Sequence, residues 1–314
     1  MPAPNAKLLT PTEASDVAFW RGLCPALSVE TATPPPSVAI DRAELDRCVE
    51  LLRVEGYINL PGILPDAELA PLRDALAALH ARNIPVAFIF VYDEAWRVFQ
   101  RLQPFLAHVL GADYRVRADF WAWFVPPSND AAGWVPHRDY TGVSCNADGS
   151  PRRLTVWLPL TDTTPLNGCM YLLPAHLDPG MRPGDAPVVP SDHRFEIPGD
   201  ALQNIRALPA TAGSLLAWNQ SVLHWGSRAS DRGGNPRCSV AAQFIRADAV
   251  AAGSPVFAPE TVPPFAERLG LIGHLICTFS GFLTFPPEIR MLGHVLDWKF
   301  RQNAGGAKQA APPA

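Results

Sequence analysis

The feature that most constrains the fold is a series of alternating segments that begins at Tyr114. Apolar residues occupy every second position in "YRVRADFWAWFVP", "RRLTVWLPLTD", "GSLLAWNQSVLHWGS" and "RCSVAAQFIRA", and glycine, proline, asparagine and aspartate separate these segments. A period of two is typical of β-strands that bury one face. Several short strands of this kind indicate a β-sandwich or a β-barrel.

Helical patterns lie on both sides of this alternating region. Three helices are predicted before it, in "DRAELDRCVELLRVEG" (41–56), "PDAELAPLRDALAALHARN" (65–83) and "DEAWRVFQRLQPFLAHVLG" (93–111). Two more are predicted after residue 258, in "VPPFAERLGLIGHLICTF" and "PPEIRMLGHVLDWKFRQN". Helices, then strands, then helices indicate an α+β fold with an antiparallel core.

The chain divides into four expected regions. Residues 1–40 are rich in proline, alanine and threonine, which predicts an irregular arm. Residues 41–257 hold the first helices and all the alternating segments, and we expect them to form the main domain. Residues 258–302 are a helical extension, and residues 303–314, "NAGGAKQAAPPA", are expected to form a disordered tail.

Charge, apolar runs and cysteines narrow the class of protein. The 314 residues carry 26 Lys+Arg and 30 Asp+Glu without a basic block, so we expect no nucleic-acid partner. No run has the form of a signal peptide or a membrane span, which predicts a cytoplasmic protein with no membrane partner. The 6 cysteines are scattered, as is typical of reduced thiols. Both a monomer and a homodimer stay open.

One histidine and one aspartate stand out in "GWVPHRDYTG" (133–142). In an extended strand His137 and Asp139 point to the same face, while Arg138 points away. His224 ends a later alternating segment in an aromatic setting. Two histidines and one carboxylate form the facial triad that holds non-haem Fe(II) and leaves positions open for a co-substrate and O₂. The other histidines are expected to be structural or exposed.

The sequence around these residues resembles the phytanoyl-CoA dioxygenase family of Fe(II)/2-oxoglutarate-dependent oxygenases. The resemblance covers roughly residues 50–246, in segments that follow the family's order: "EGYINLPGILPDAELAPLRDAL" (55–76), "PHRDYTG", "LTVWLPLTDTTPLNGCMYLLPAHL" (154–177), "GSLLAWNQSVLHWGS" (213–227) and "PRCSVAAQFI" (236–245). It implies a double-stranded β-helix, which is a jelly-roll or cupin-like core, with the N-terminal and C-terminal helices packed around it.

The resemblance also implies a set of ligands. His137, Asp139 and His224 would bind Fe(II), with 2-oxoglutarate and O₂ as co-substrates. An arginine after the last histidine would bind the distal carboxylate of 2-oxoglutarate through its planar fork. Arg237 is the best match. Because "ASDRGGNPR" is slightly longer than the family's usual spacing, Arg232 and Arg228 stay open as alternatives.

Further residues are expected near this site. Ser239 would point to the same face as Arg237, and Thr155 shares a strand face with Trp157. In the family the equivalent tryptophan lines the co-substrate pocket, although a role in the barrel core is an equal alternative for Trp157. Four residues close to the triad in sequence are expected to border the substrate: Phe124, Trp134, Arg138 and Tyr140.

The reaction that the resemblance implies is hydroxylation of an unactivated C–H bond in a small organic molecule, with release of succinate and CO₂. The presence of Asp139 disfavours halogenation, because related halogenases carry a small residue there. Desaturation, epoxidation or ring formation with the same cofactors stay open. Two alternatives of other classes are a zinc hydrolase, which could use the same three ligands, and a non-catalytic jelly-roll binding protein.

Overall fold

The computed structural model describes residues 8–306, except 32, 132, 191–194, 196, 198, 252 and 253. The chain forms two compact units. One unit spans Pro35–Arg73 and Phe99–Glu260, and the other spans Met1–Pro34, Asp74–Val98 and Thr261–Ala314. All the strands described belong to the first unit, which we call the sheet unit, and the second is called the helical unit.

The elements follow the order expected from the sequence. The helices are α1 (Pro11–Ala14), α2 (Val17–Leu23), α3 (Arg42–Val54), α4 (Asp66–Ala81), α5 (Asp93–Gln100), α6 (Gln103–Leu110), α7 (Phe265–Phe279) and α8 (Pro287–Gly306). The strands are β1 (Tyr57–Leu60), β2 (Arg115–Val125), β3 (Arg153–Pro159), β4 (Met170–Leu172), β5 (Arg206–Leu208), β6 (Leu215–Asn219), β7 (His224–Gly226), β8 (Arg237–Ile245) and β9 (Val256–Phe257).

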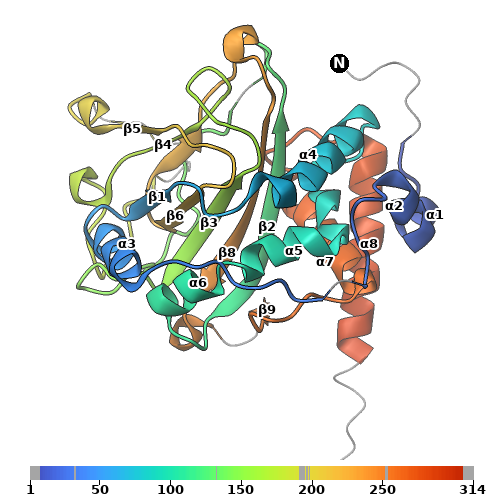
Figure 1. Ribbon diagram of the computed structural model, residues 1–314, viewed down its shortest axis with the longest axis horizontal. Coiled ribbons are helices and arrows are strands. Elements are labelled where there is room, and N and C mark those ends of the chain that lie inside the picture. Colours follow the sequence, from blue (N-terminus) through green and yellow to red (C-terminus); the bar gives the residue numbers. More distant parts are fainter. Residues whose placement is uncertain are drawn as a thin grey trace, which may run out of the picture. The chain divides into compact units, whose positions relative to one another are not determined.

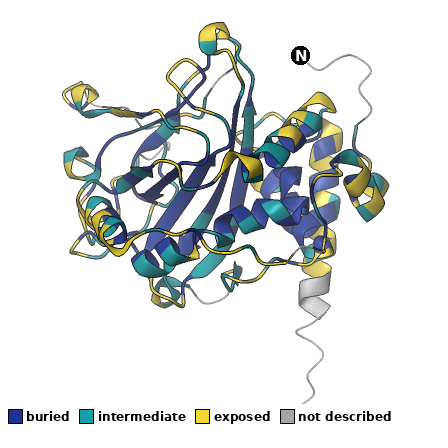
Figure 2. Ribbon diagram, in the orientation of Figure 1, coloured by how far each residue is buried: buried dark blue, intermediate teal, exposed yellow. Residues whose placement is uncertain are grey.

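The strands form two antiparallel sheets. The larger has the order β1-β6-β3-β8-β2-β9, and the smaller has the order β5-β4-β7. Strands β6, β3 and β8 lie side by side in the middle of the larger sheet (Figure 1) and are buried along almost their whole length (Figure 2). The expected α+β fold with an antiparallel core is therefore confirmed.

The two sheets share an apolar core. In the register of the larger sheet Thr155 lies opposite Trp218 on β6, and Trp157 lies opposite Ala241 on β8. The side chains of Trp157, Trp218 and Ala241 pack in one cluster with Met170 of the smaller sheet. We call the face of the larger sheet that carries these residues the inner face. Strand alternation then assigns every second residue of β2, β3, β6 and β8 to it.

Two segments differ from the sequence-based expectation. The helix predicted over 93–111 is split into α5 and α6, because Pro104 in the first turn of α6 has no N–H to continue α5. The arm predicted to be irregular contains α1 and α2. A capping box between Thr10 and Glu13 begins α1, and the Asp16 side chain caps α2, so local polar contacts stabilise these short helices.

The helical unit contains the two predicted C-terminal helices. Helices α7 and α8 lie side by side (Figure 1), and Gly273 lets the backbone of α7 approach Leu296 of α8. At the start of α7, the buried Arg268 forms an ion pair of 2.6 Å with Asp93 and donates to the carbonyl of Val91. Helix α8 ends at Gly306, so the expected tail lies mostly outside the described residues. Among the described residues, none of the helices combines the length and apolarity needed to span a bilayer.

Candidate metal centre

His137 and His224 face each other across an antiparallel bridge. The backbone N–H of each donates to the carbonyl of the other at 3.0 Å. Their imidazole rings have centroids 4.3 Å apart. Asp139 completes the group, since one ligand atom from each of the three residues lies within 4.8 Å of the other two. The structure therefore brings together two histidines and one carboxylate that are 87 positions apart at most in the chain (His137 to His224).

Hydrogen bonds fix the tautomer of both histidines. Nδ1 of His137 donates to the carbonyl of Val135 at 2.8 Å, and Nδ1 of His224 donates to the carbonyl of Val222 at 3.0 Å. Each Nε2 is thereby left with a lone pair, as a metal-binding imidazole requires. Burial lowers the pKa of His224 to about 4, so this ring is neutral at physiological pH.

Asp139 presents one oxygen to the histidines. Its Oδ2 accepts hydrogen bonds from Thr155 Oγ1 at 2.7 Å and from Trp218 Nε1 at 3.0 Å. Its Oδ1 lies 3.5 Å from Nε2 of His137 and 3.5 Å from Nε2 of His224. Burial acts to raise the pKa of Asp139, but the two histidines and the Thr155 hydroxyl outweigh it and hold that pKa far below its ordinary value. The carboxylate is therefore ionised.

A group of buried donors without partners lies on the inner face beyond these ligands. Arg237 Nε, Ser239 Oγ and Trp157 Nε1 are all buried and accept or donate no hydrogen bond within the part of the chain that is described. Arg237 and Ser239 point to the same side because they are two residues apart on β8, and Trp157 lies opposite Ala241, the next residue of that series. The sequence-based expectation of shared faces is therefore met.

Arg237 is a buried cation without a counterion. Its side chain is almost fully buried, and no described carboxylate lies within ion-pair distance of it. Its Nη1 donates a long hydrogen bond of 3.8 Å to the sulfur of Met170. Desolvation lowers the pKa of Arg237 to about 10, which leaves it charged at physiological pH. The alternatives Arg228 and Arg232 are both exposed, and Arg228 donates to the carbonyl of Asn129.

The guanidinium of Arg237 lies beside strand β7. A Cβ placed on Gly226 would lie 3.2 Å from Arg237 Nη1. Gly226 is two residues after His224 on the same strand, so the two positions share a face. The position that adjoins the Arg237 guanidinium therefore lies on the same face of β7 as His224.

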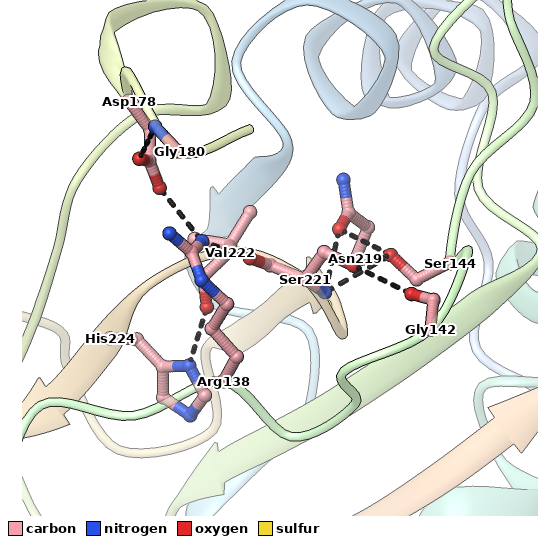
Figure 3. Close-up of polar contacts among 9 residues, drawn as sticks. All are labelled: Arg138, Gly142, Ser144, Asp178, Gly180, Asn219, Ser221, Val222 and His224. Carbon is pink, nitrogen blue, oxygen red and sulfur yellow. Dashed lines mark hydrogen bonds and ion pairs between the residues drawn. The ribbon is translucent and has the colours of Figure 1, made fainter. Parts of the chain in front are cut away.

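Arg138 points away from the triad and ties three segments together. Its Nη1 forms a buried ion pair of 2.8 Å with Asp178 and donates to the carbonyl of Ser221 at 2.5 Å (Figure 3). The second oxygen of Asp178 accepts from the N–H of Gly180. Arg138 thus connects the His137–Asp139 segment to the turn before His224 and to the loop after residue 178. Its predicted role at the substrate does not match this position.

A small hydroxyl and amide network holds the same turn. The N–H of Ser221 donates to Asn219 Oδ1 and to Ser144 Oγ, both at 3.0 Å (Figure 3). Ser144 Oγ also donates to Asn219 Oδ1 at 3.0 Å. These buried bonds fix the path of the chain from β6 into β7, and therefore the position of His224 at the start of β7.

The other three expected substrate neighbours lie in different places. The Trp134 ring contacts the His137 ring edge to face, with centroids 6.0 Å apart. Tyr140 lies under the guanidinium of Arg153. Phe124 pairs with Cys238, so it lies on the face of the sheet opposite to Ser239 and does not border the site. Sequence proximity alone had suggested Phe124.

Sequence reasoning missed one residue that contacts a candidate ligand and one that contacts the neighbouring Arg138. Trp218 donates to Asp139, and Asp178 pairs with Arg138. Trp218 stands in the same alternating segment as His224, six residues earlier, so alternation gave a weak signal for it. Asp178 lies in a loop, where no periodic pattern indicates a partner.

Comparisons with known proteins agree with this geometry. The sequence model of the family described as Phytanoyl-CoA dioxygenase (PhyH) matches residues 52–233. No curated protein matches the chain in a sequence search.

Several solved structures are similar in fold. One is the epimerase SnoN in complex with Fe³⁺, alpha ketoglutarate and nogalamycin RO, with 23% identity, a TM-score of 0.52, and 66% of this chain and 85% of that chain covered. The non-haem alpha ketoglutarate dependent carbocyclase SnoK from nogalamycin biosynthesis has 17% identity, a TM-score of 0.50, and coverages of 73% and 98%. The non-haem monooxygenase ThoJ has 19% identity, a TM-score of 0.52, and coverages of 78% and 98%.

The sequence model spans more than half of the chain and includes the segments that carry His137, Asp139 and His224. The two antiparallel sheets and the meeting of these three side chains agree with that match. The chain belongs to the phytanoyl-CoA dioxygenase family.

Proposed function

We propose that this protein is a non-haem Fe(II)/2-oxoglutarate-dependent oxygenase that hydroxylates a small organic molecule. In this proposal the two sheets form a double-stranded β-helix, with the candidate metal centre between them. Family membership supports the proposal. So does the likeness in fold to SnoN, whose solved complex contains Fe³⁺ and alpha ketoglutarate.

The observation that carries the proposal is the state of the three donor atoms. Both histidines use Nδ1 to bond a carbonyl, and Asp139 uses Oδ2 to accept two hydrogen bonds. Two Nε2 atoms and one carboxylate oxygen are left facing one another. All three carry lone pairs, and none of them carries a proton that could form a hydrogen bond to the others. Two imidazoles and one carboxylate suit Fe(II), and hydrogen bonds to the far side of each ligand are usual at such metal centres.

The unpartnered donors fit a bound keto-diacid. We assign the distal carboxylate of 2-oxoglutarate to Arg237, because a buried guanidinium without a counterion gains a charged partner there. Ser239 Oγ and Trp157 Nε1 would donate to the same co-substrate, and Thr155 would act by orienting Asp139. A zinc hydrolase would need no such buried arginine, so this arrangement favours the oxygenase over that alternative.

The protein's own residues would hold and shield the reactants. Iron, 2-oxoglutarate and O₂ together supply the oxidation of a C–H bond, with succinate and CO₂ as products. Asp139 and the histidines would fix the metal, while Arg237 fixes the orientation of the co-substrate. Trp157 and Trp218 would exclude water from the pocket. The near-balanced charge of the chain supports a small-molecule substrate, and we propose a cytoplasmic location.

An anaerobic absorption experiment tests this proposal. Fe(II) and 2-oxoglutarate added together should give a weak visible metal-to-ligand band, which neither component gives alone. His137→Ala should abolish the band, because it removes one of the three ligands. His176→Ala is the matched control, since His176 is half exposed and lies outside the triad. Absence of the band in the unaltered protein, or its survival in His137→Ala, would contradict the proposal.

A further inference from the structure

A second unpaired arginine lies on the inner face, on the other side of Asp139 from Arg237. Arg153 is two residues before Thr155 on β3, so their side chains point to the same side. The Thr155 hydroxyl bonds Asp139. Arg237, in contrast, lies beyond Ser239, which pairs with Pro159 at the far end of β3. Six residues of strand, about 20 Å at about 3.3 Å per residue, separate the Arg153 end from the Pro159 end.

Arg153 is held in place but not neutralised. Its guanidinium carbon lies 3.9 Å from the centre of the Tyr140 ring, and its Nη2 donates to the carbonyl of Ala249 at 3.4 Å. Its Nη1 is buried and has no hydrogen-bond partner within the described residues. The whole residue is only 7% exposed. A stacked guanidinium with one free edge is oriented to bind an anion in the plane of that edge.

Among the described residues, no acidic side chain forms an ion pair with Arg153. Besides Tyr140, on whose ring it stacks, the charged groups that act on Arg153 are Arg117 and Arg152, which are also positive. Burial lowers the pKa of Arg153 from its ordinary value, as expected for a desolvated cation without a counterion. A buried cation in this state is unfavourable unless a ligand supplies the missing charge.

A buried amide adds to the same end of the site. Gln220 follows the last residue of β6, Asn219, which pairs with Leu154. The Gln220 carbonyl accepts at 3.0 Å from the N–H of Tyr140, the residue whose ring lies against the Arg153 guanidinium. Both Nε2 and Oε1 of the Gln220 side chain are buried without a partner among the described residues. This end therefore offers the Nη1 of a guanidinium and a side-chain amide, neither of which has a hydrogen-bond partner among the described residues.

We infer that Arg153, oriented by Tyr140 and assisted by Gln220, binds a carboxylate of the substrate. This inference rests on the proposed function, because it takes Arg237 as the residue that binds 2-oxoglutarate. One guanidinium and one neutral amide match a single negative charge, so a carboxylate fits better than a phosphate dianion. Arg153 and Thr155 are about 7 Å apart along β3, so the oxidised carbon lies a few bonds from the carboxylate.

The test uses a panel of acids and their neutral derivatives. Aliphatic and aromatic monocarboxylates, their methyl esters and the corresponding phosphate monoesters are added anaerobically to the protein loaded with Fe(II) and 2-oxoglutarate. The shift of the visible band reports binding near the metal, and succinate release in air reports coupled turnover. We expect carboxylates to bind at least about tenfold more tightly than their methyl esters, a difference of about 1.4 kcal/mol.

Variants of neighbouring residues separate this role from a structural one. Arg153→Gln should remove the preference for acids over esters, and Arg153→Lys should retain part of it. Arg206→Gln is the matched control, because Arg206 is an exposed arginine on β5 of the smaller sheet and should leave the preference intact. Circular dichroism confirms that each variant is folded. The rescue by lysine would not occur if Arg153 served only to pack against Tyr140.

The possible results distinguish failure of this inference from failure of the proposed function. Equal binding of acids and esters, tighter binding of phosphates, or an equal effect of Arg206→Gln would overturn the inference. If Arg153→Gln abolished the Fe(II)–2-oxoglutarate band while Arg237→Met kept it, Arg153 would be the co-substrate residue and the inference would be wrong. Absence of the band in the unaltered protein is a different result, since it removes the proposed function itself.

Discussion

Replacing Arg237 with methionine should make the protein more stable and unable to bind 2-oxoglutarate. The side chain is buried, and no described carboxylate pairs with it. Methionine keeps the unbranched apolar stem and removes the charge. Since it is the unpaired charge that destabilises the ligand-free fold, its removal should raise the free energy of unfolding.

The magnitude follows from the pKa of the guanidinium. Burial lowers the pKa of Arg237 to about 10, from an ordinary value of 12.5. That difference corresponds to roughly 3 kcal/mol of unfavourable free energy in the folded state. The folded state holds this proton less tightly than the unfolded state, so the whole penalty is present at neutral pH and fades only above pH 10. The smaller methionine leaves some empty space, which costs about 1 kcal/mol, so the net gain is about 2 kcal/mol.

Urea unfolding followed by circular dichroism measures this gain. The experiment compares the unaltered protein, Arg237→Met and Arg228→Met without metal, and then with Mn(II) and saturating 2-oxoglutarate. Arg228 is exposed, so its variant should stay within about 0.5 kcal/mol of the unaltered protein. At 100 times its dissociation constant 2-oxoglutarate should stabilise the unaltered protein by about 2.7 kcal/mol and Arg237→Met not at all.

Two results would refute this reasoning. If ligand-free Arg237→Met were less stable than the unaltered protein, the guanidinium would have a favourable partner and would not be an unpaired cation. If 2-oxoglutarate stabilised Arg237→Met as strongly as the unaltered protein, another residue would bind the distal carboxylate.

Three further substitutions test the supports of the site. Asp178→Asn leaves Arg138 as an uncompensated buried charge, so urea unfolding should show a loss of about 3 kcal/mol or more; a loss below 1 kcal/mol would contradict this. Gly226→Ala places a methyl group 3.2 Å from Arg237 Nη1, so titration of the visible band should show about tenfold weaker 2-oxoglutarate binding with unchanged Fe(II) binding. Thr155→Val removes one of two hydrogen bonds to Asp139 Oδ2, so the Fe(II) dissociation constant should rise about tenfold or more. Competition with a chromophoric chelator measures this constant, and an unchanged value would show that Trp218 alone orients Asp139.

The sequence contained enough information to choose the three side chains that the structure brings together as candidate metal ligands. Alternation puts His137 and Asp139 on one face and turns Arg138 to the other, and in the structure Arg138 turns to Asp178. Local capping signals were equally informative, since Asp41 caps α3 as expected. These predictions succeeded because they depend on residues that are close together in the chain.

The rest of the site depends on strand register, which a single sequence does not specify. The contact of Trp218 with Asp139 requires β6 to pair with β3 in one alignment, which places Thr155 opposite Trp218. Phe124 illustrates the difficulty. Alternation divides β2 into two faces, but only the pairing of Trp123 with Ser239 shows which face is turned inward, and Phe124 lies on the other one.

The buried polar groups that lack hydrogen-bond partners indicate which core positions serve ligand binding and not packing. A core built only for stability would place apolar side chains at these positions, because a buried donor without a partner costs about 1–3 kcal/mol. Between the two sheets, Arg237, Ser239 and Trp157 carry such donors at one end and Arg153 and Gln220 at the other, with Asp139 and its histidines between them. Among the described residues no carboxylate pairs with Arg237 or Arg153, and no single small ligand spans about 20 Å of strand. The arrangement therefore fits two different anions, one on each side of a metal. In a 2-oxoglutarate-dependent oxygenase that acts on a carboxylic acid, these would be 2-oxoglutarate and the substrate.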